Sequence, residues 1–136
     1  MVSAIDTASG QLFAACLGEA SVRRLFEVDL KFKRQTGRRS ACALGRPGGA
    51  QFDASALTEL QAQCQARADG AVVVGVSALA APVLDNCGQI VLALTAIGTS
   101  AALDTCWDGP QAALLRQAAR TASALLGWQP HPTPSA

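Results

Sequence analysis

The chain has 136 residues, of which 50% are hydrophobic and 15% are charged. This length suits one domain, and this composition lies far from the polar, highly charged chains that stay disordered. Eleven basic and ten acidic residues leave a net charge of +1, so no overall positive field attracts nucleic acid or an anionic membrane.

The apolar run at 90–97 is far shorter than the roughly 20 residues that span a bilayer, and the N-terminus lacks the pattern of a secretory signal. We therefore expect a cytoplasmic protein with no membrane partner. The five scattered cysteines have no C-x-x-C spacing, which is typical of reduced intracellular thiols. The only histidine, His131, lies in the Pro-rich segment "QPHPTPSA". We expect no metal site, no cofactor and no catalytic residues.

Two short helices are expected first. "TASGQLFAACL" at 7–17 places apolar residues on one helical face, with Thr7 or Ser9 as the N-cap, and "EASVRRLFEVDLKF" repeats this pattern after Gly18. From 31 to 50 the sequence has no clean period, which predicts a loop. Its basic residues either face solvent or contact phosphate, and we favour solvent because no aromatic residues lie between them.

"DASALTELQAQCQARADG" at 53–70 predicts a third helix, which Asp53 or Ser55 can cap and Gly70 can end. "DGPQAALLRQAARTASALLGW" at 108–128 predicts a C-terminal helix with Pro110 in its first turn and Gly127 near its end. Beyond it, we expect 129–136 to form a disordered Pro-rich tail.

Between these helices, "DNCG" at 85–88 predicts a type I turn with a Gly bulge, so the flanking apolar segments should pair as an antiparallel hairpin. Both faces of this hairpin are apolar, so both should be covered. Pro82 requires an open edge or a bulge nearby, and a slip of one residue would exchange the two faces. The expected pairs are Val83 with Val91, Ala81 with Ala93, Leu79 with Thr95, and Ser77 near Ile97.

The segment "ARADGAVVVGVSALAAPVLDNCGQIVLALTAIGTSAALD", followed by a helix that ends in "TASALLGW", resembles the C-terminal effector-binding domain of IclR-type bacterial transcriptional regulators. The hallmark of that domain is a G-V-S-A-x-A-A-P-V-x-D-x-x-G hairpin before an A-L-S/T-x-x-G strand. "TASGQLFAACLGEASVRRLF" is similar to the family's A-T-A-x-G-K-A-x-L-A-x-L helix. The resemblance implies an α/β (α+β) fold over residues 1–128, with helices packed on a GAF-like antiparallel sheet.

The resemblance also implies a function. Domains of this type bind a small organic acid or aromatic metabolite, assemble as homo-oligomers (dimers or tetramers), and modulate DNA binding by a winged helix-turn-helix domain. By this resemblance, we expect that the chain lacks that DNA-binding domain and starts later than a complete effector domain. We therefore expect contact with DNA only through a segment that is absent from this chain.

The implied pocket lies between the sheet and the helix at 7–17. A carboxylate suits the start of this helix, where backbone N–H groups are free and the helix dipole favours negative charge. Asp69 would repel an anionic ligand unless it binds a hydroxyl, is protonated or faces away, and its alternative role is that of a turn residue after a helix. Carried over from the family, the ligand-binding residues are Val2, Ala8, Ser9, Asp69, Val76, Ala78, Thr95 and Ile97.

Two other functions stay open on the sequence. One is a stand-alone GAF-like assembly module whose pocket is filled by its own side chains. The other is a small enzyme that uses Asp69 or a cysteine, which we disfavour because no base and nucleophile pair is visible.

Overall fold

The computed structural model describes residues 6–16, 18–36, 54–70 and 72–130. Its strands form one antiparallel sheet in the order β1-β2-β3, and helices pack on this sheet, which confirms the expected α+β class. The elements are α1 (Ala8–Cys16), α2 (Glu19–Thr36), α3 (Ala54–Gln63), β1 (Ala66–Asp69), β2 (Val76–Leu84), β3 (Ile90–Thr99) and α4 (Pro110–Leu125).

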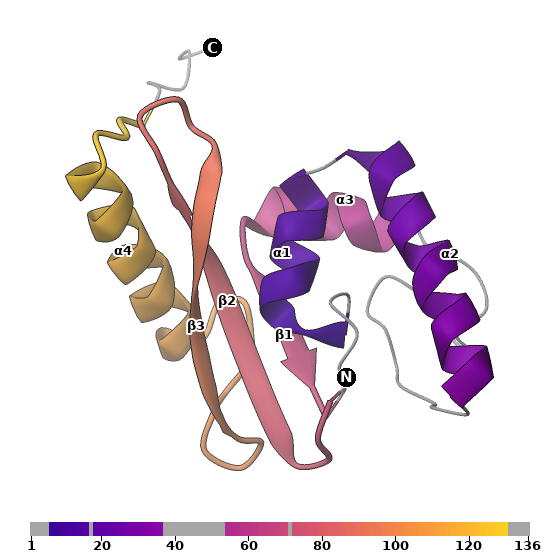
Figure 1. Cartoon of the computed structure of the whole chain (residues 1–136). Helices are drawn as coiled ribbons and strands as arrows, with labels where there is room; N and C mark the ends of the chain where they lie inside the picture. The colour runs from indigo at the N-terminus through magenta and orange to yellow at the C-terminus, as the bar shows by residue number, and fades with distance from the viewer. Residues whose placement is uncertain (1–5, 17, 37–53, 71, 131–136) are drawn as a thin grey trace.

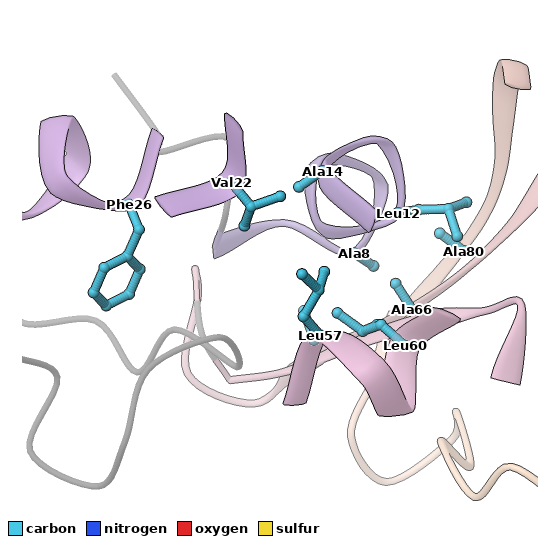
Figure 2. Packing of buried hydrophobic residues seen from close by; sticks show 10 residues of the cluster. Ala8, Leu12, Ala14, Val22, Phe26, Leu57, Leu60, Ala66 and Ala80 are labelled. Carbon is cyan, nitrogen blue, oxygen red and sulfur yellow. The ribbon is translucent and has the colours of Figure 1, made fainter. Parts of the chain in front are cut away.

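The sheet separates two layers of helices (Figure 1). On one face α4 packs against Ala81 and Val83 through Ala119. On the other face lie α1 and α3, with α2 outermost. Figure 2 shows Leu12 of α1 directed toward Ala80 of β2, with α3 beneath α1. β2 is therefore covered on both faces, as predicted, but β3 is covered only in part: no residue of β3 is buried, and Val91, Leu92 and Ile97 are 47%, 46% and 71% exposed.

The second helix is longer than the sequence predicted. It continues through residues 31–36, which were expected to begin the loop, and ends at Thr36. The ammonium group of Lys33 lies 2.8 Å from the Asp29 carboxylate one turn earlier and 2.7 Å from the Asp6 carboxylate before α1. These contacts stabilise the last turns of α2. One of the two partners, Asp6, lies 27 positions away from Lys33 in sequence. The rest of the expected loop lies outside the described residues.

The predicted helix at 53–70 ends early, and the prediction for its last residues was wrong. Helix α3 ends at Gln63, and the next residue, Cys64, adopts a positive φ of 49°. Gln65 is then fully buried, donates to the carbonyl of Ala112 at 2.9 Å and accepts from Arg116 at 2.8 Å. These contacts pull the chain into β1, which pairs with β2 from Ala66 opposite Ala80 onward.

The hairpin turn is confirmed. Gly88 has a positive φ of 75°, and its N–H donates to the carbonyl of Asp85 at 3.0 Å. The Asp85 carboxylate also accepts from the N–H of Cys87 at 2.8 Å. Among the described strands, the pairing of β1 with β2 ends at Ala80, which leaves the segment around Pro82 with the open edge that proline requires.

The predicted register holds only next to the turn. Leu84 lies opposite Ile90, but a bulge between Val83 and Leu84 places Val83 opposite Leu92. The bulge therefore shifts every later pair by one residue and exchanges the expected faces of β3. The observed pairs include Ala81 with Leu94, Ala80 with Thr95, and Ala78 with Ile97.

The last helix follows its predicted end signals. Gly109 precedes it, Pro110 lies in its first turn, and Gly127 has a positive φ of 86° just after it. No described helix is long and apolar enough to cross a membrane. Residues 131–136 of the expected tail lie outside the described residues.

Candidate functional site

The start of α1 is built by Thr7. Its side-chain oxygen accepts from the N–H of Gly10 at 3.0 Å, and its carbonyl accepts from the N–H of Gln11 at 3.0 Å. Thr7 is thus the N-cap, one of the two candidates from the sequence. The N–H groups of Ala8 and Ser9 belong to the first turn, where no intrahelical acceptor is available.

A hydroxyl pair joins this helix start to the sheet. The Ser9 and Thr95 hydroxyl oxygens lie 2.9 Å apart, although the two residues are 86 positions apart in sequence. Only one of the two hydroxyls donates in this bond, so the O–H of the other can donate to a third group. Both side chains are half-buried. Ser9 and Thr95, which the resemblance assigned to one pocket, are therefore in contact.

Most of the expected sheet residues share the face that α1 covers. Ala80 packs in the α1 cluster, and side chains alternate along a strand, so Ala78 and Val76 lie on the same face. Thr95 lies opposite Ala80 and Ile97 opposite Ala78. The bulge makes this possible, because the register predicted from the sequence would have placed Thr95 on the α4 face. Ile97 is 71% exposed, so it lies at the open margin of this group.

Asp69 lies on the other face of the sheet. It lies opposite Ser77 at the end of β1, next to the pair of Ala68 and Ala78. Because side chains alternate along a strand, Asp69 points to the opposite face from Ala68. Its carboxylate accepts hydrogen bonds from Ser77 at 2.5 Å and from Ser100 at 3.1 Å. The hydrogen bond from Ser77 has the larger effect and the bond from Ser100 the next, and together they lower the pKa of Asp69 below its usual value. The structure therefore separates Asp69 from the residues around α1.

Six of the eight expected residues are thus on the α1 side of the sheet, Asp69 is on the α4 side, and Val2 lies outside the described residues. The group on the α1 side comprises Ala8, Ser9, Val76, Ala78, Thr95 and Ile97.

Sequence reasoning missed one polar residue on α1. Gln11 is 1% exposed, and within the described part of the chain neither its amide nitrogen nor its amide oxygen has a hydrogen-bond partner. It lies between the buried residues Ala8 and Ala14 on the inner side of the helix. The sequence signal that could have revealed it is a single polar residue among the apolar residues of the buried helix side, three positions after Ala8.

Two of the four described thiols, those of Cys16 and Cys106, are poorly suited to nucleophilic chemistry. Burial and the neighbouring Cys64 raise the pKa of Cys16. A hydrogen bond with Asp104 and the negative charge of Asp104 raise the pKa of Cys106. A raised pKa reduces the fraction of reactive thiolate at neutral pH.

Solved structures place this arrangement in a known fold. HmgR from Pseudomonas aeruginosa matches 94% of the chain at 27% identity with a TM-score of 0.71. IclR from Thermotoga maritima matches 92% at 15% identity with a TM-score of 0.63. The fold is that of an IclR-type effector-binding domain. The resemblance read from the sequence motifs is thereby confirmed.

A further structural neighbour is the inducer-binding domain of the transcription factor PobR from Acinetobacter, solved as a double mutant in complex with 3-hydroxybenzoic acid. It matches 90% of the chain at 19% identity with a TM-score of 0.61. The chain covers 46% of HmgR, 47% of IclR and 66% of the PobR domain, so it spans about half the length of the first two. No protein-family model matches the chain, and no curated protein matches it in sequence.

Proposed function

We propose that this chain is the effector-sensing part of an IclR-type transcriptional regulator. It binds a small organic acid or aromatic metabolite and modulates DNA binding by a separate winged helix-turn-helix domain. The observation that carries this proposal is the 2.9 Å hydroxyl pair of Ser9 and Thr95, which sets the first turn of α1 against the sheet. N–H groups at a helix start attract a carboxylate, and adjacent hydroxyls can donate to it.

The comparisons support the same function. A domain of this fold has been solved with 3-hydroxybenzoic acid, which makes an aromatic acid a reasonable ligand class for this chain. Neighbours of this fold include transcriptional regulators, which favours a protein that is not an enzyme. We place it in the cytoplasm, where such regulators meet their metabolites.

Ligand binding is tested by thermal unfolding with a panel of small carboxylates and aromatic acids at millimolar concentration. At least one acid should raise the melting temperature, because a ligand that binds only the folded state stabilises it. If no acid across a broad panel does so, the alternative of a stand-alone assembly module without a ligand is favoured.

The position of the ligand is tested by Thr95→Val, which keeps the shape of the side chain and removes its hydroxyl. We expect the dissociation constant of the best acid to rise about tenfold, the loss of one hydrogen bond to a charged group. Thr121→Val, on the exposed side of α4, is the control and should leave the constant unchanged. If the Thr95→Val variant and the unmodified protein bind the acid with equal affinity, the ligand does not contact Thr95 of β3.

We also propose that the chain self-associates. β3 is an edge strand among the described strands, and large apolar side chains are exposed on β3 and α4, including Ile97, Leu114 and Leu125. Such surface is costly to leave in water and suits a second copy. Light scattering after size exclusion should give a mass above 13.9 kDa, and a monomer at all concentrations would contradict self-association.

A further inference from the structure

A buried ion pair lies directly before the start of α1. The ammonium group of Lys33 contacts the Asp6 carboxylate at 2.7 Å and the Asp29 carboxylate at 2.8 Å. Asp6 is only 4% exposed. A carboxylate that is removed from water needs a nearby cation or hydrogen-bond donors, because burial makes its charge costly. Lys33 therefore supplies positive charge to a carboxylate that burial would otherwise make unfavourable.

Asp6 belongs to the segment that builds the proposed ligand position. It immediately precedes Thr7, the N-cap of α1. The Cα atom of Asp6 lies at most about 7.6 Å from that of Ala8, twice the spacing of consecutive Cα atoms. Helix α2 runs back along α1, so its last turns return to the level of the α1 start (Figure 1). The contact with Lys33 thus acts on the backbone just before the N–H groups of Ala8 and Ser9.

The charge of Asp6 affects which ligands the start of α1 can hold. A carboxylate close to a helix N-terminus interacts with the same dipole that attracts the carboxylate of a ligand. Asp6 and an acidic ligand would therefore repel each other, and burial limits how far solvent screens this repulsion. The six candidate residues on the α1 side include no basic side chain. Lys33 is the cation that the structure places against Asp6.

We propose that Lys33 is a positioning residue for the effector: it holds and neutralises Asp6, and thereby lets the start of α1 bind an acid in preference to an uncharged analogue. Lys33 acts through Asp6 and does not touch the ligand. This inference rests on the proposed function, and it adds the residue on which the preference of that site for anions depends.

The test compares acids with their uncharged amides. The probes are benzoate with benzamide and propionate with propionamide, and a third pair is the tightest acid of the thermal-unfolding panel with its amide. Dissociation constants are measured by ligand-observed NMR titration on the whole chain. The preference is the dissociation constant of the amide divided by that of the acid. A variant that only loosens the fold weakens both ligands alike, whereas a change of charge beside the site acts on the acid.

Lys33→Met should reduce the preference at least about fivefold, because the Asp6 carboxylate then faces the acid without its cation. Lys33→Arg keeps the positive charge and should retain the preference within about twofold. Asp6→Asn removes the negative charge and should increase the preference. Changes of opposite sign at Lys33 and Asp6 are not expected from a general loss of stability.

Arg23→Met is the matched control for removal of one cation from α2. Its ion pair with Glu19 is exposed, and Arg23 lies about 15 Å from Lys33 along the helix, at 1.5 Å per residue. Solvent and salt screen an exposed charge at this distance. Arg23→Met should therefore leave the preference within about twofold of that of the unmodified protein.

Two results overturn the inference while the proposed function stands. The first is an unchanged preference in Lys33→Met, which would mean that Lys33 only stabilises the fold. The second is an unchanged or lower preference in Asp6→Asn, and this result decides alone if circular dichroism shows that Lys33→Met does not fold. If no acid of the panel binds the unmodified protein, the proposed function fails and the inference fails with it.

Discussion

The carboxylate of Asp69 and the amide of Gln11 differ in what surrounds them. Asp69 is exposed, yet two hydroxyls donate to it, and Ser77 and Ser100 are themselves 2.7 Å apart. This cluster ties the end of β1 to the start of β2 and to the turn after β3. The carboxylate of Asp69, which the resemblance gave as a ligand contact, is therefore engaged by its own chain, whereas the buried amide of Gln11 has no hydrogen-bond partner within the described residues.

We expect Asp69→Asn to lower the melting temperature at neutral pH, because the amide accepts the two hydroxyl bonds less strongly than the charged carboxylate. The folded protein lowers the pKa of Asp69 below 3.8, so the carboxylate stabilises the fold above that value. This contribution is lost as the pH falls through the folded pKa. The difference in melting temperature between the two proteins should thus be constant near pH 7 and shrink below about pH 4.

The same measurement on Asp108→Asn, in the exposed segment before α4, serves as the control for removal of one negative charge. A difference for Asp69→Asn that stays constant down to pH 2.5, on the order of one unit below the usual carboxyl pKa, would contradict this role. It would mean that the ionised state of Asp69 does not contribute to folding.

At the scale of elements, the ion triad of Asp6, Asp29 and Lys33 decides how far α2 extends. The three side chains are only 6%, 11% and 12% exposed. Burial acts to lower the pKa of Lys33, but its hydrogen bonds to Asp29 and Asp6 outweigh burial and raise that pKa. Lys33 therefore stays charged and connects α2 to the residue just before the α1 N-cap.

Lys33→Met should leave two carboxylates close together with no cation between them, and we expect a loss of about 3 kcal/mol in the free energy of unfolding. Hydrogen exchange should accelerate in the last turns of α2. Arg23→Met is the matched control, because its ion pair with Glu19 is 53% and 54% exposed and contributes less than about 1 kcal/mol. Equal losses in the two variants would show that the triad does not anchor α2.

The elements that sequence patterns predicted are those with local signals. The hairpin follows from Asp85 and Gly88 at the turn, and α4 follows from Pro110 and Gly127 at its ends. The extension of α2 and the conversion of 66–69 into β1 depend on distant partners, Asp6 in one case and Arg116 in the other. For the candidate site, the residue types were predictable, but the face of Thr95 and Ile97 was set by the bulge, and the face of Asp69 was set by the pairing of β1 with β2.

At the scale of the whole molecule, the two helix layers share one sheet, and β2 is its central strand. Leu79 in the middle of β2 is fully buried. Because alternate residues of β2 pack against α1 on one face and α4 on the other, we expect both layers to unfold together rather than one after the other.

Leu79→Ala should lower the free energy of unfolding by about 2–5 kcal/mol, the usual cost of a cavity of this size. Circular dichroism, which reports all helices, and the fluorescence of Trp107 and Trp128 near the ends of α4 should give the same lowered midpoint. Val74→Ala, at a residue that is 93% exposed, should change stability by about 0.5 kcal/mol or less. Separate midpoints for the two signals would indicate independent layers.

The bulge beside Val83 limits which changes of sequence this fold tolerates. Substitutions at Thr95 or Ile97 alter the chemistry of the α1 face one side chain at a time. Removal or insertion of a single residue between the turn and Thr95 would instead turn both side chains toward α4 and present Leu94 and Ala96 to α1. New ligand preferences in such a domain can therefore arise by point substitution in β3, whereas a change of length in that strand would exchange its two faces.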